Sequence, residues 1–308
     1  MLLIDMEEKI SPFVLETKKI EIPGYPDAFN PSIIRLHGKL LMSFRFRLPM
    51  TLSTNPIALV WLDEDFNAIA EPQILDIPHP HPWQQDARLI SIRDHLYVVY
   101  SNLFGGLRRM YVAEVFNDDG AFFAGEDFPL LHYDQEPKPQ EKNWVPFDYD
   151  GHLLLAYSIN PHCIFRPIQS MCETIAVTEK NVAWEWGELR GGTPAHRIGD
   201  QYVAFFHSST DAASLQSNAE SMPHYVMGCY TFSLQPPFEM TAISPEPIIG
   251  KNFYNGPSHQ TWKPLRVVFP GGFVCDDQYI HLVYGKQDHE CWVAKIEIEG
   301  LLRSLSRP

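Results

Sequence analysis

Short hydrophobic runs recur along the chain, and turns that contain glycine or aspartate separate them. Five segments share one order: a small or polar opening, a hydrophobic run, a turn, and a second hydrophobic run that ends near an aromatic residue. Runs of this length that are rich in β-branched and aromatic residues predict β-strands, and the turn between two of them predicts a hairpin. The five segments are residues 30–45, 86–101, 144–158, 192–207 and 269–285.

The five predicted hairpins recur along the whole chain. Their closing aromatic residues are Phe44, Tyr100, Tyr157, Phe206 and Tyr284, which lie 56, 57, 49 and 78 residues apart. A further strand candidate follows each hairpin, at 57–62, 110–115, 173–178, 225–232 and 291–298. A unit of several strands that repeats about every 40–50 residues is typical of a β-propeller blade. We therefore predict an all-β, five-bladed β-propeller rather than a β-sandwich, which does not require one hairpin to recur.

The rest of the chain fits one domain over residues 1–308. The long last interval predicts loop insertions at 208–222 and 249–263. A helical pattern is confined to 300–307, which predicts a short C-terminal helix after a short N-terminal lead-in. No linker or block of charge marks a domain boundary.

The amino-acid composition agrees with the predicted β-propeller and argues against some classes of binding partner. The chain has 26 prolines and 13% aromatic residues, which favours strands joined by rigid loops. Lys and Arg number 24 against 38 Asp and Glu, a net charge of −14, which argues against nucleic acid or an anionic membrane as partner. The N-terminus lacks the basic start and apolar stretch of a secretory signal, and the five cysteines form no CxxC pair. We expect a cytoplasmic protein with reduced thiols.

Polar residues open and close the predicted hairpins. Because the innermost strands of a propeller surround one axis, residues at equivalent places in the five repeats are expected to gather there. The openings supply Asn30, Asp86, Arg88, Lys142, Asn143 and Thr193, and the closings supply Arg45, Arg47, Ser101, Ser158, His207 and Asp288. The alternative is that each of them caps a turn or forms a surface ion pair.

Several short motifs carry a resemblance to a known family. They are QDAR at 85–88, EKNWVPF at 141–147, GGTP at 191–194, FH at 206–207, PHY at 223–225, SPEPI at 244–248, VVFPG at 267–271 and YGKQD at 284–288. In this order they resemble the mannoside phosphorylases of glycoside hydrolase family 130, over nearly the whole chain. The resemblance implies a five-bladed propeller that cleaves or forms β-mannosidic bonds, usually by phosphorolysis with inversion.

The resemblance also implies roles for individual residues. Asp86, in a motif that reads Asp-Ala-Arg where the family has Asp-Pro-Arg, corresponds to the general acid. Phosphate would be bound by Arg88, Lys142 and His207, and Asp288 would contact the sugar. From their axial positions we expect Asn30, Arg45 and Asn143 to contact substrate as well. Aromatic residues that could stack on sugars, or else pack between blades, are Trp83, Trp144, Tyr254 and Trp262.

The residues fit this chemistry without the resemblance. Glycosyl transfer needs a proton donor for the departing oxygen and a nucleophile on the opposite face of the sugar. A phosphate nucleophile needs a cationic cradle and no second carboxylate. A water nucleophile needs a base, for which Glu141, Asp148 and Asp288 are candidates. Arg88 should lower the pKa of Asp86 unless burial near tryptophan or a relay through a sugar hydroxyl offsets it.

The expected partner is therefore a mannose-containing oligosaccharide or a mannosyl phosphate, with inorganic phosphate as co-substrate and no other cofactor. Hydrolysis or mannosyl transfer on the same fold stays open, as does an oligomer. A non-catalytic carbohydrate-binding propeller and a protein-interaction scaffold are the alternatives from other functional classes. His79 and His81 alternate with prolines and lack a third ligand nearby, so no metal site is predicted.

Overall fold

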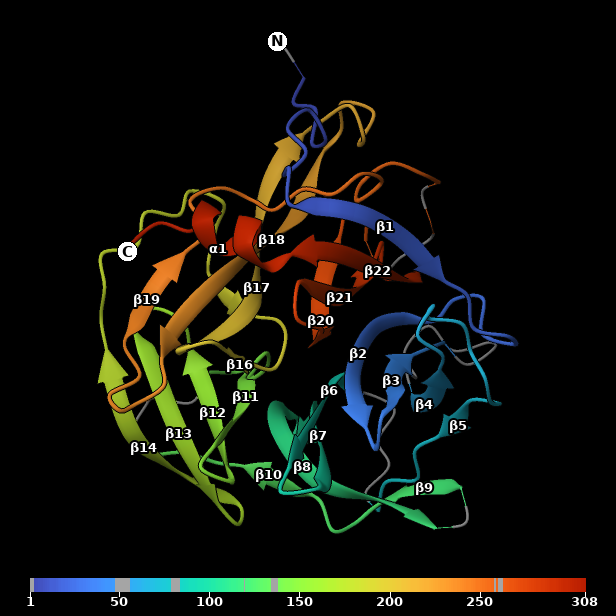
Figure 1. Cartoon of the computed structure of the whole chain (residues 1–308), viewed down its shortest axis with the longest axis vertical. Helices are drawn as coiled ribbons and strands as arrows, with labels where there is room; N and C mark the ends of the chain where they lie inside the picture. Colours follow the sequence, from blue (N-terminus) through green and yellow to red (C-terminus); the bar gives the residue numbers. More distant parts are fainter. Residues whose placement is uncertain are drawn as a thin grey trace.

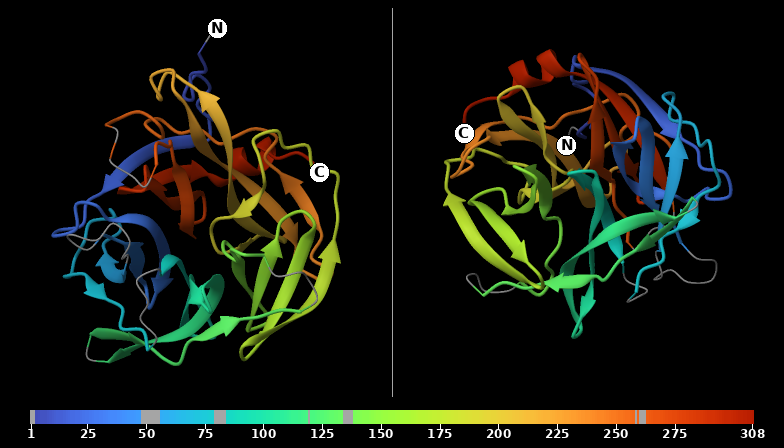
Figure 2. Two further views of the ribbon diagram at one scale, coloured as in Figure 1. Left: turned by 180° about the vertical axis from the view of Figure 1, so that it is seen from behind. Right: turned by 60° about the horizontal axis from the view of Figure 1, so that its bottom comes forward.

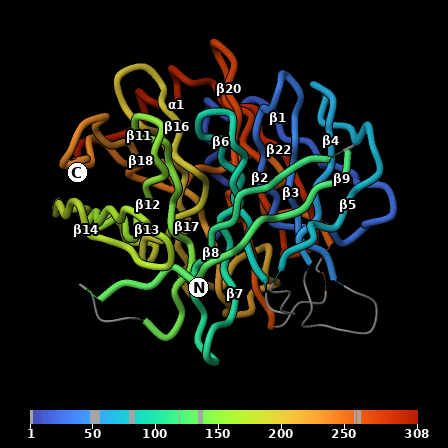
Figure 3. The backbone as a smooth tube through the Cα atoms, turned by 90° about the horizontal axis from the view of Figure 1, so that it is seen from below, coloured from blue at the N-terminus to red at the C-terminus, as the bar shows by residue number. Residues whose placement is uncertain are grey.

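The computed structural model describes residues 3–47, 56–78, 84–118, 120–133, 138–257, 259 and 263–308. Five antiparallel sheets are arranged in a ring around a central axis (Figures 1 and 2), which confirms the predicted five-bladed β-propeller. Seen from the side, the strands run between the two faces of the ring (Figure 3).

Each of the first four blades is a sheet of strands that are consecutive in the chain, and we number the blades by their order in the chain. Blade 1 contains β2 (Phe29–Leu36), β3 (Lys39–Arg45), β4 (Ile57–Leu62) and β5 (Gln73–Ile74). Blade 2 contains β6 (Gln85–Ile92), β7 (His95–Phe104), β8 (Leu107–Asp118), β9 (Ala121–Ala124) and β10 (Phe128–Leu130). Blade 3 contains β11 (Val145–Tyr149), β12 (His152–Ser158), β13 (His162–Ile168) and β14 (Met171–Thr178).

In blade 4 two short strands pair with the same neighbouring strand, and blade 5 includes a strand from the N-terminal part of the chain. Blade 4 contains β15 (Arg190–Gly191), β16 (His196–Ile198), β17 (Gln201–Ala213), β18 (Ser221–Ser233) and β19 (Met240–Ile243). Blade 5 contains β20 (Val268–Cys275), β21 (Tyr279–Lys286), β22 (Glu290–Glu297) and, from the other end of the chain, β1 (Val14–Ile20). Because β1 pairs with β22 from Val14↔Ile296 to Ile20↔Cys291, the two ends of the chain close the ring within one blade.

The predicted strands and helix can be compared with these elements directly. The candidate at 57–62 is β4, and the other four candidates lie within or overlap β8, β14, β18 and β22. The predicted helix is α1 (Ile298–Ser304), which starts and ends a few residues earlier than expected.

The prediction of a loop insertion at 208–222 is wrong. There β17 and β18 stay paired from Ser208↔Val226 out to Ala213↔Ser221, so the extra residues lengthen a hairpin. The described residues of the other insertion, up to 257, contain no strand.

The hydrophobic core lies between neighbouring blades. Ile34 and Leu41 of blade 1 belong to the same buried cluster as Leu89 and Val98 of blade 2. Blades 4 and 5 share another cluster, which includes Phe205 and Phe273. Apolar burial of this kind is the main stabilising contribution to folding, and it takes up the flanks of the blades. The polar openings of the inner strands are left to meet at the axis. Among the described residues, no helix has the length and apolar character needed to cross a membrane.

Candidate active site

The opening residues of the first three blades share an unusual backbone conformation. Asn30, Asp86 and Asn143 have φ angles of 48°, 55° and 65°, in the left-handed region where Asn and Asp are enriched among non-glycine residues. Asn30 and Asp86 each sit at a break in strand register, between Phe29 and Ser32 of β2 and between Gln85 and Arg88 of β6. Such a bulge takes one residue out of strand alternation and re-aims its side chain. The sequence repeat is thus a repeat of local geometry.

Asp86 is the carboxylate at the axis. It is buried, and its Oδ1 atom accepts hydrogen bonds from Asn30 Nδ2 at 3.0 Å and from Arg45 Nη1 at 2.6 Å. Burial alone would raise the pKa of Asp86, but the positive charges of Arg45, Arg88 and Lys142 outweigh it and hold that pKa well below its usual range. Asp86 is therefore an ionised carboxylate in the free protein.

Arg88 is a fully buried guanidinium that links three blades. Its Nε donates to the carbonyl oxygen of Gly192, Nη1 to the carbonyl oxygen of Asp86 at 2.9 Å, and Nη2 to Asn143 Oδ1 at 3.2 Å and the carbonyl oxygen of Gly191 at 3.4 Å. Burial lowers its pKa to about 10, against the opposing effect of Asp86, so it stays charged at neutral pH. Because the protein itself engages most of its donors, we assign Arg88 to holding the site together rather than to contacting phosphate.

We predict that Arg88→Met lowers the free energy of unfolding by about 3–5 kcal/mol, because it leaves four buried acceptors and the Asp86 charge without their partner. Urea unfolding measures the change. The matched control is Arg35→Met, which removes an ion pair to Glu64 between side chains 41% and 69% exposed and should cost less than about 1 kcal/mol. Equal losses of unfolding free energy in the two variants would contradict the assignment of Arg88 to holding the site together.

A second group of cations consists of Lys142, which precedes the first strand of blade 3, and Arg190 of blade 4. The ammonium of Lys142 has no hydrogen-bond partner among the described residues. Burial lowers the pKa of Lys142, and Arg108, Arg190 and Arg45 lower it further against the effect of Asp86. Arg190 donates from Nη2 to Ser209 Oγ at 2.6 Å and lies over the ring of Tyr225, while its buried Nε has no partner. Of these groups, the Lys142 ammonium is the donor that could meet an anion directly, whereas the Arg190 Nε is without a partner but enclosed.

His207 lies directly across from Arg190, since β15 and β17 pair in the register Arg190↔His207. Its ring is buried, with its centroid 4.8 Å from that of Phe269, and its Nδ1 atom has no partner. Burial lowers the pKa of His207 well below its usual value, and Arg190, Arg88 and Lys142 lower it further. The imidazole is therefore neutral at pH 7 and can donate one N–H.

Two further arginines of the site were not predicted from the sequence: Arg190, whose charge acts on Lys142 and His207, and Arg108, whose pKa Asp86 affects. Arg190 precedes Gly191 in β15, a strand of two residues that is too short to show an alternating pattern. Gly191 leaves room there, because a Cβ atom at this position would collide with the carbonyl oxygen of Asn143. Arg108 donates from Nη1 to Ser101 Oγ at 3.1 Å and is close enough to Asp86 and Arg45 for their charges to affect its pKa. Neither belongs to a motif that the sequence analysis singled out.

Two of the candidate aromatic residues pack inside the fold, so the prediction that Trp144 contacts substrate is wrong. Trp144 is 1% exposed and packs edge-on against Tyr157 and Phe165, with His132 alongside, in a buried cluster shared by blades 2 and 3. Tyr254 is equally buried, and its hydroxyl donates to the carbonyl oxygen of Tyr225. Both follow the alternative of packing within the fold. Trp83, Trp262, His79 and His81 lie outside the described residues.

The three candidate bases occupy different environments. Glu141 is buried and bound to His132 Nε2 at 3.2 Å and the backbone N–H of Lys138 at 2.7 Å. Asp148 lines a cavity together with Ile90 and Ser91, at the end of β6 remote from Asp86. Ile90 lies four residues along the strand from Asp86, which corresponds to roughly 13 Å. Asp288 is half-buried beside Arg47, whose Nη2 donates to its carbonyl oxygen. Glu141 is thus enclosed and Asp148 is remote from Asp86, whereas Asp288 is partly exposed beside Arg47.

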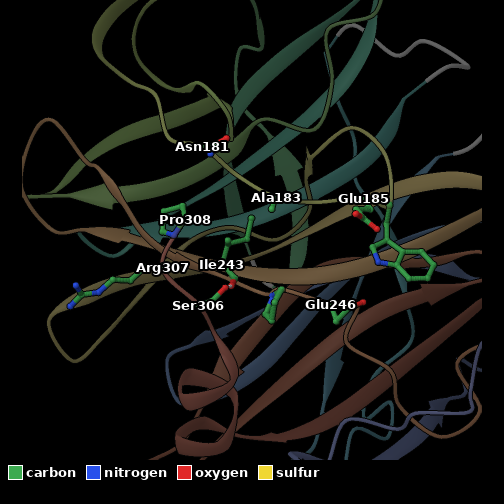
Figure 4. Close-up of a pocket in the computed structure, with 10 residues that line it drawn as sticks. Asn181, Ala183, Glu185, Ile243, Glu246, Ser306, Arg307 and Pro308 are labelled. Atoms are coloured by element: carbon green, nitrogen blue, oxygen red, sulfur yellow. The ribbon is translucent and has the colours of Figure 1, made fainter.

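A groove leads outward from the second group of cations. It has a volume of about 510 Å³, with Lys142, Asn143 and Arg190 at its inner end and Tyr157 and Trp184 further out. We call it the blade 3–4 groove. A second cavity, of about 410 Å³, lies elsewhere and is lined by Ile243, Glu246 and Arg307, among others (Figure 4).

The hydroxyl groups of Thr193 and Ser158 form hydrogen bonds within the protein. Thr193 Oγ1 accepts from the N–H of Phe205, and Ser158 Oγ donates to the carbonyl oxygen of Pro161.

The described part of the chain contains no cluster of three or more His, Cys, Asp or Glu side chains arranged to hold a metal ion. The chain matches no protein-family model and no curated protein sequence.

Solved structures give matches along almost the full chain. A mannose phosphorylase from Leishmania mexicana in complex with phosphate ion is 14% identical, with 92% of this chain and 89% of that chain covered at a TM-score of 0.62. A β-1,2-mannobiose phosphorylase from Listeria innocua, in complex with β-1,2-mannobiose, is 14% identical, with coverages of 96% and 94% and a TM-score of 0.63. A glycosyl hydrolase from Bacteroides ovatus is also 14% identical, with coverages of 97% and 95% and a TM-score of 0.65. At this identity the likeness shows a shared fold.

Proposed function

We propose that the chain is a carbohydrate-active enzyme of glycoside hydrolase family 130 that cleaves or forms β-mannosidic bonds by inverting phosphorolysis at the propeller axis. One observation carries the proposal: the buried carboxylate of Asp86 is close enough to Lys142 to be affected by its charge, Lys142 is likewise close to Arg190, and the protein leaves donors of both cations partly unused. The family motifs and the shared fold of two mannoside-specific phosphorylases support it.

The cations of this site suit the attack by phosphate, and Asp86 suits the transfer of a proton to the departing sugar oxygen. In the direction of cleavage, a phosphate oxygen bound by Lys142, Arg190 and His207 attacks the anomeric carbon of the mannosyl group. The bond from that carbon to the departing sugar oxygen breaks, and the oxygen takes a proton delivered through Asp86. Attack on the face opposite to the leaving group inverts the configuration, and phosphate removes the need for a second catalytic carboxylate.

The ionised carboxylate of Asp86 in the free enzyme is the protonation state that the direction of synthesis requires. There the carboxylate acts as a base and takes the proton from the acceptor hydroxyl as that oxygen attacks mannose 1-phosphate. For cleavage, a bound phosphate dianion offsets the charges of Lys142 and Arg190, which raises the pKa of Asp86. A sugar hydroxyl hydrogen-bonded to Asp86 can complete the proton path.

Hydrolysis is the second candidate, and one observation bears on it. A hydrolase needs a second carboxylate to activate water. Because Glu141 is enclosed by His132 and Asp148 lies at the other end of the blade, Asp288 would have to supply that group. Mannosyl transfer would use the same cations for a mannosyl phosphate donor.

The reaction is tested in the direction of synthesis. Enzyme is incubated with α-mannose 1-phosphate and a panel of monosaccharide acceptors, and released inorganic phosphate is measured. We expect acceptor-dependent release of phosphate together with a β-mannoside. Release at the same rate without acceptor would indicate hydrolysis, and no release with any acceptor would favour a binding module.

Phosphate binding should weaken at alkaline pH through Lys142. Because burial lowers the pKa of this lysine below 10.5, its positive charge is lost as the pH rises through that lowered value. The dissociation constant for phosphate, measured by calorimetry, should therefore rise with pH in the wild type. In Lys142→Arg the rise should begin at a higher pH, since an arginine keeps its charge to a higher pH than a lysine in the same surroundings. An identical alkaline rise in both proteins would remove Lys142 from the anion site.

A further inference from the structure

The blade 3–4 groove begins at the proposed anion site and continues well past it. Its inner end is formed by Lys142 and Arg190, the cations assigned above to phosphate, and its volume is about 510 Å³. Cavities of roughly 300–1,000 Å³ are the size that holds small organic ligands. A phosphate ion contacts only the inner end. The remaining length is thus available to a group attached to that phosphate.

The outer walls of the groove are rigid aromatic surfaces. The Trp184 indole donates from Nε1 to Ser208 Oγ at 2.8 Å and packs edge-on against Phe206, with ring centroids 4.9 Å apart. Tyr157 stacks on Phe165 with a centroid distance of 4.7 Å and an interplanar angle of 29°. Both rings are half-buried, and the ammonium of Lys138 lies over the Tyr157 ring, 5.6 Å from its centroid. Such fixed rings favour a ligand with a flat ring of its own.

Charge along the groove favours an anion at its inner end. Among the described lining residues, the acidic one is Glu188, at the outer rim. Its side chain is 72% exposed and lies 3.8 Å from Lys138, itself 55% exposed, so solvent screens this pair. At the inner end, the buried Nε of Arg190 has no partner. The groove therefore combines a cationic inner end with an aromatic outer part.

We propose that this groove holds the organic group of a ring-bearing phosphate monoester whose phosphoryl group binds at Lys142 and Arg190. The proposal rests on the proposed function and extends its co-substrate from inorganic phosphate to organic phosphates. An oxygen of the dianionic monoester attacks the mannosyl anomeric carbon and forms a new C–O bond. The bond to the departing sugar oxygen breaks, that oxygen takes a proton through Asp86, and the product is a monoanionic mannosyl phosphodiester.

Binding of three phosphates to the full chain tests the proposal by calorimetry. The probes are inorganic phosphate, methyl phosphate and phenyl phosphate. We expect phenyl phosphate to bind about tenfold more tightly than the other two, because its ring leaves water and meets fixed aromatic walls. Phenyl phosphate that binds no more tightly than inorganic phosphate would overturn the proposal while leaving the proposed function intact. No binding of any of the three would overturn both.

A groove-filling variant separates the organic group from the phosphoryl group. Glu188→Trp places a large side chain in the outer groove at an exposed position, so the fold should tolerate it. It should abolish the tenfold preference for phenyl phosphate and leave the affinity for inorganic phosphate unchanged. Glu246→Trp, at an exposed position in the other cavity (Figure 4), is the matched control and should change neither. A preference that survives in Glu188→Trp would contradict the proposal.

Discussion

Asp86→Asn is expected to reduce kcat for cleavage of β-mannosides by about 10²–10⁴-fold, the range typical of losing a general acid–base group. Asparagine keeps an oxygen that can accept from Asn30 and Arg45, so the shape of the site is retained. It cannot transfer the proton that the leaving oxygen requires. Steady-state kinetics at saturating phosphate measure the loss.

The same variant has a second expected result that separates lost chemistry from lost folding. Removing the Asp86 charge makes the site more positive, because Arg45, Arg88 and Lys142 no longer face a carboxylate. Phosphate should therefore bind more tightly to Asp86→Asn than to the wild type. The buried cations also lose their partner, so the melting temperature is expected to fall somewhat. Unchanged turnover, or weaker binding of phosphate, would remove Asp86 from the proposed role.

Arg190→Met is expected to raise KM for phosphate by about 10- to 100-fold, while KM for the mannoside changes little. Hydrogen bonds to a charged group contribute about 1.5–3 kcal/mol each, which corresponds to that range. Methionine removes the guanidinium that lies over Tyr225 but keeps a side chain of similar length to fill its place, so the blade should stay intact. Initial rates at varied phosphate, with the mannoside held at saturation, give the value.

The control for Arg190 is Arg197→Met. Arg197 is an exposed arginine of the same blade that donates from Nε to the carbonyl oxygen of Gly199 and lines the cavity at the other end of the inner strands. Its removal changes the net charge by the same amount away from the proposed anion site. If both variants raise KM for phosphate equally, the effect is one of overall charge, and Arg190 is not a ligand.

The sequence predicted the fold because its signal is repeated five times. Hairpin periodicity depends on local turns and strands, so it survives in the chain even where the overall identity to solved structures is 12–15%. The same repeat placed Asn30 and Asp86 at equivalent positions, and the structure joins them by a hydrogen bond between blades. The hairpin over 208–222 was mistaken for a loop, because its polar residues pair through backbone atoms that side-chain patterns do not reveal.

The candidate site was harder to predict than the fold. Whether a charged side chain is open to a ligand depends on contacts between distant segments, as Arg88 illustrates by donating to the backbone of Gly191 and Gly192. Trp144 likewise resembles a sugar-stacking residue in the sequence and lies inside an aromatic cluster. Arg190 could not be predicted as a site residue because its strand has only two residues, too few to form a recognisable pattern. The assignments of Asp86, Lys142 and His207 stay predictions.

The most direct test of the central claim is to follow cleavage of a β-mannoside by proton and phosphorus nuclear magnetic resonance, with and without inorganic phosphate. β-1,2-Mannobiose is the first substrate to try, with β-mannosides of other linkages alongside it. We predict that α-mannose 1-phosphate forms in the presence of phosphate and that the mannoside stays intact without it. Free mannose released at the same rate with and without phosphate would contradict phosphorolysis and identify the enzyme as a hydrolase.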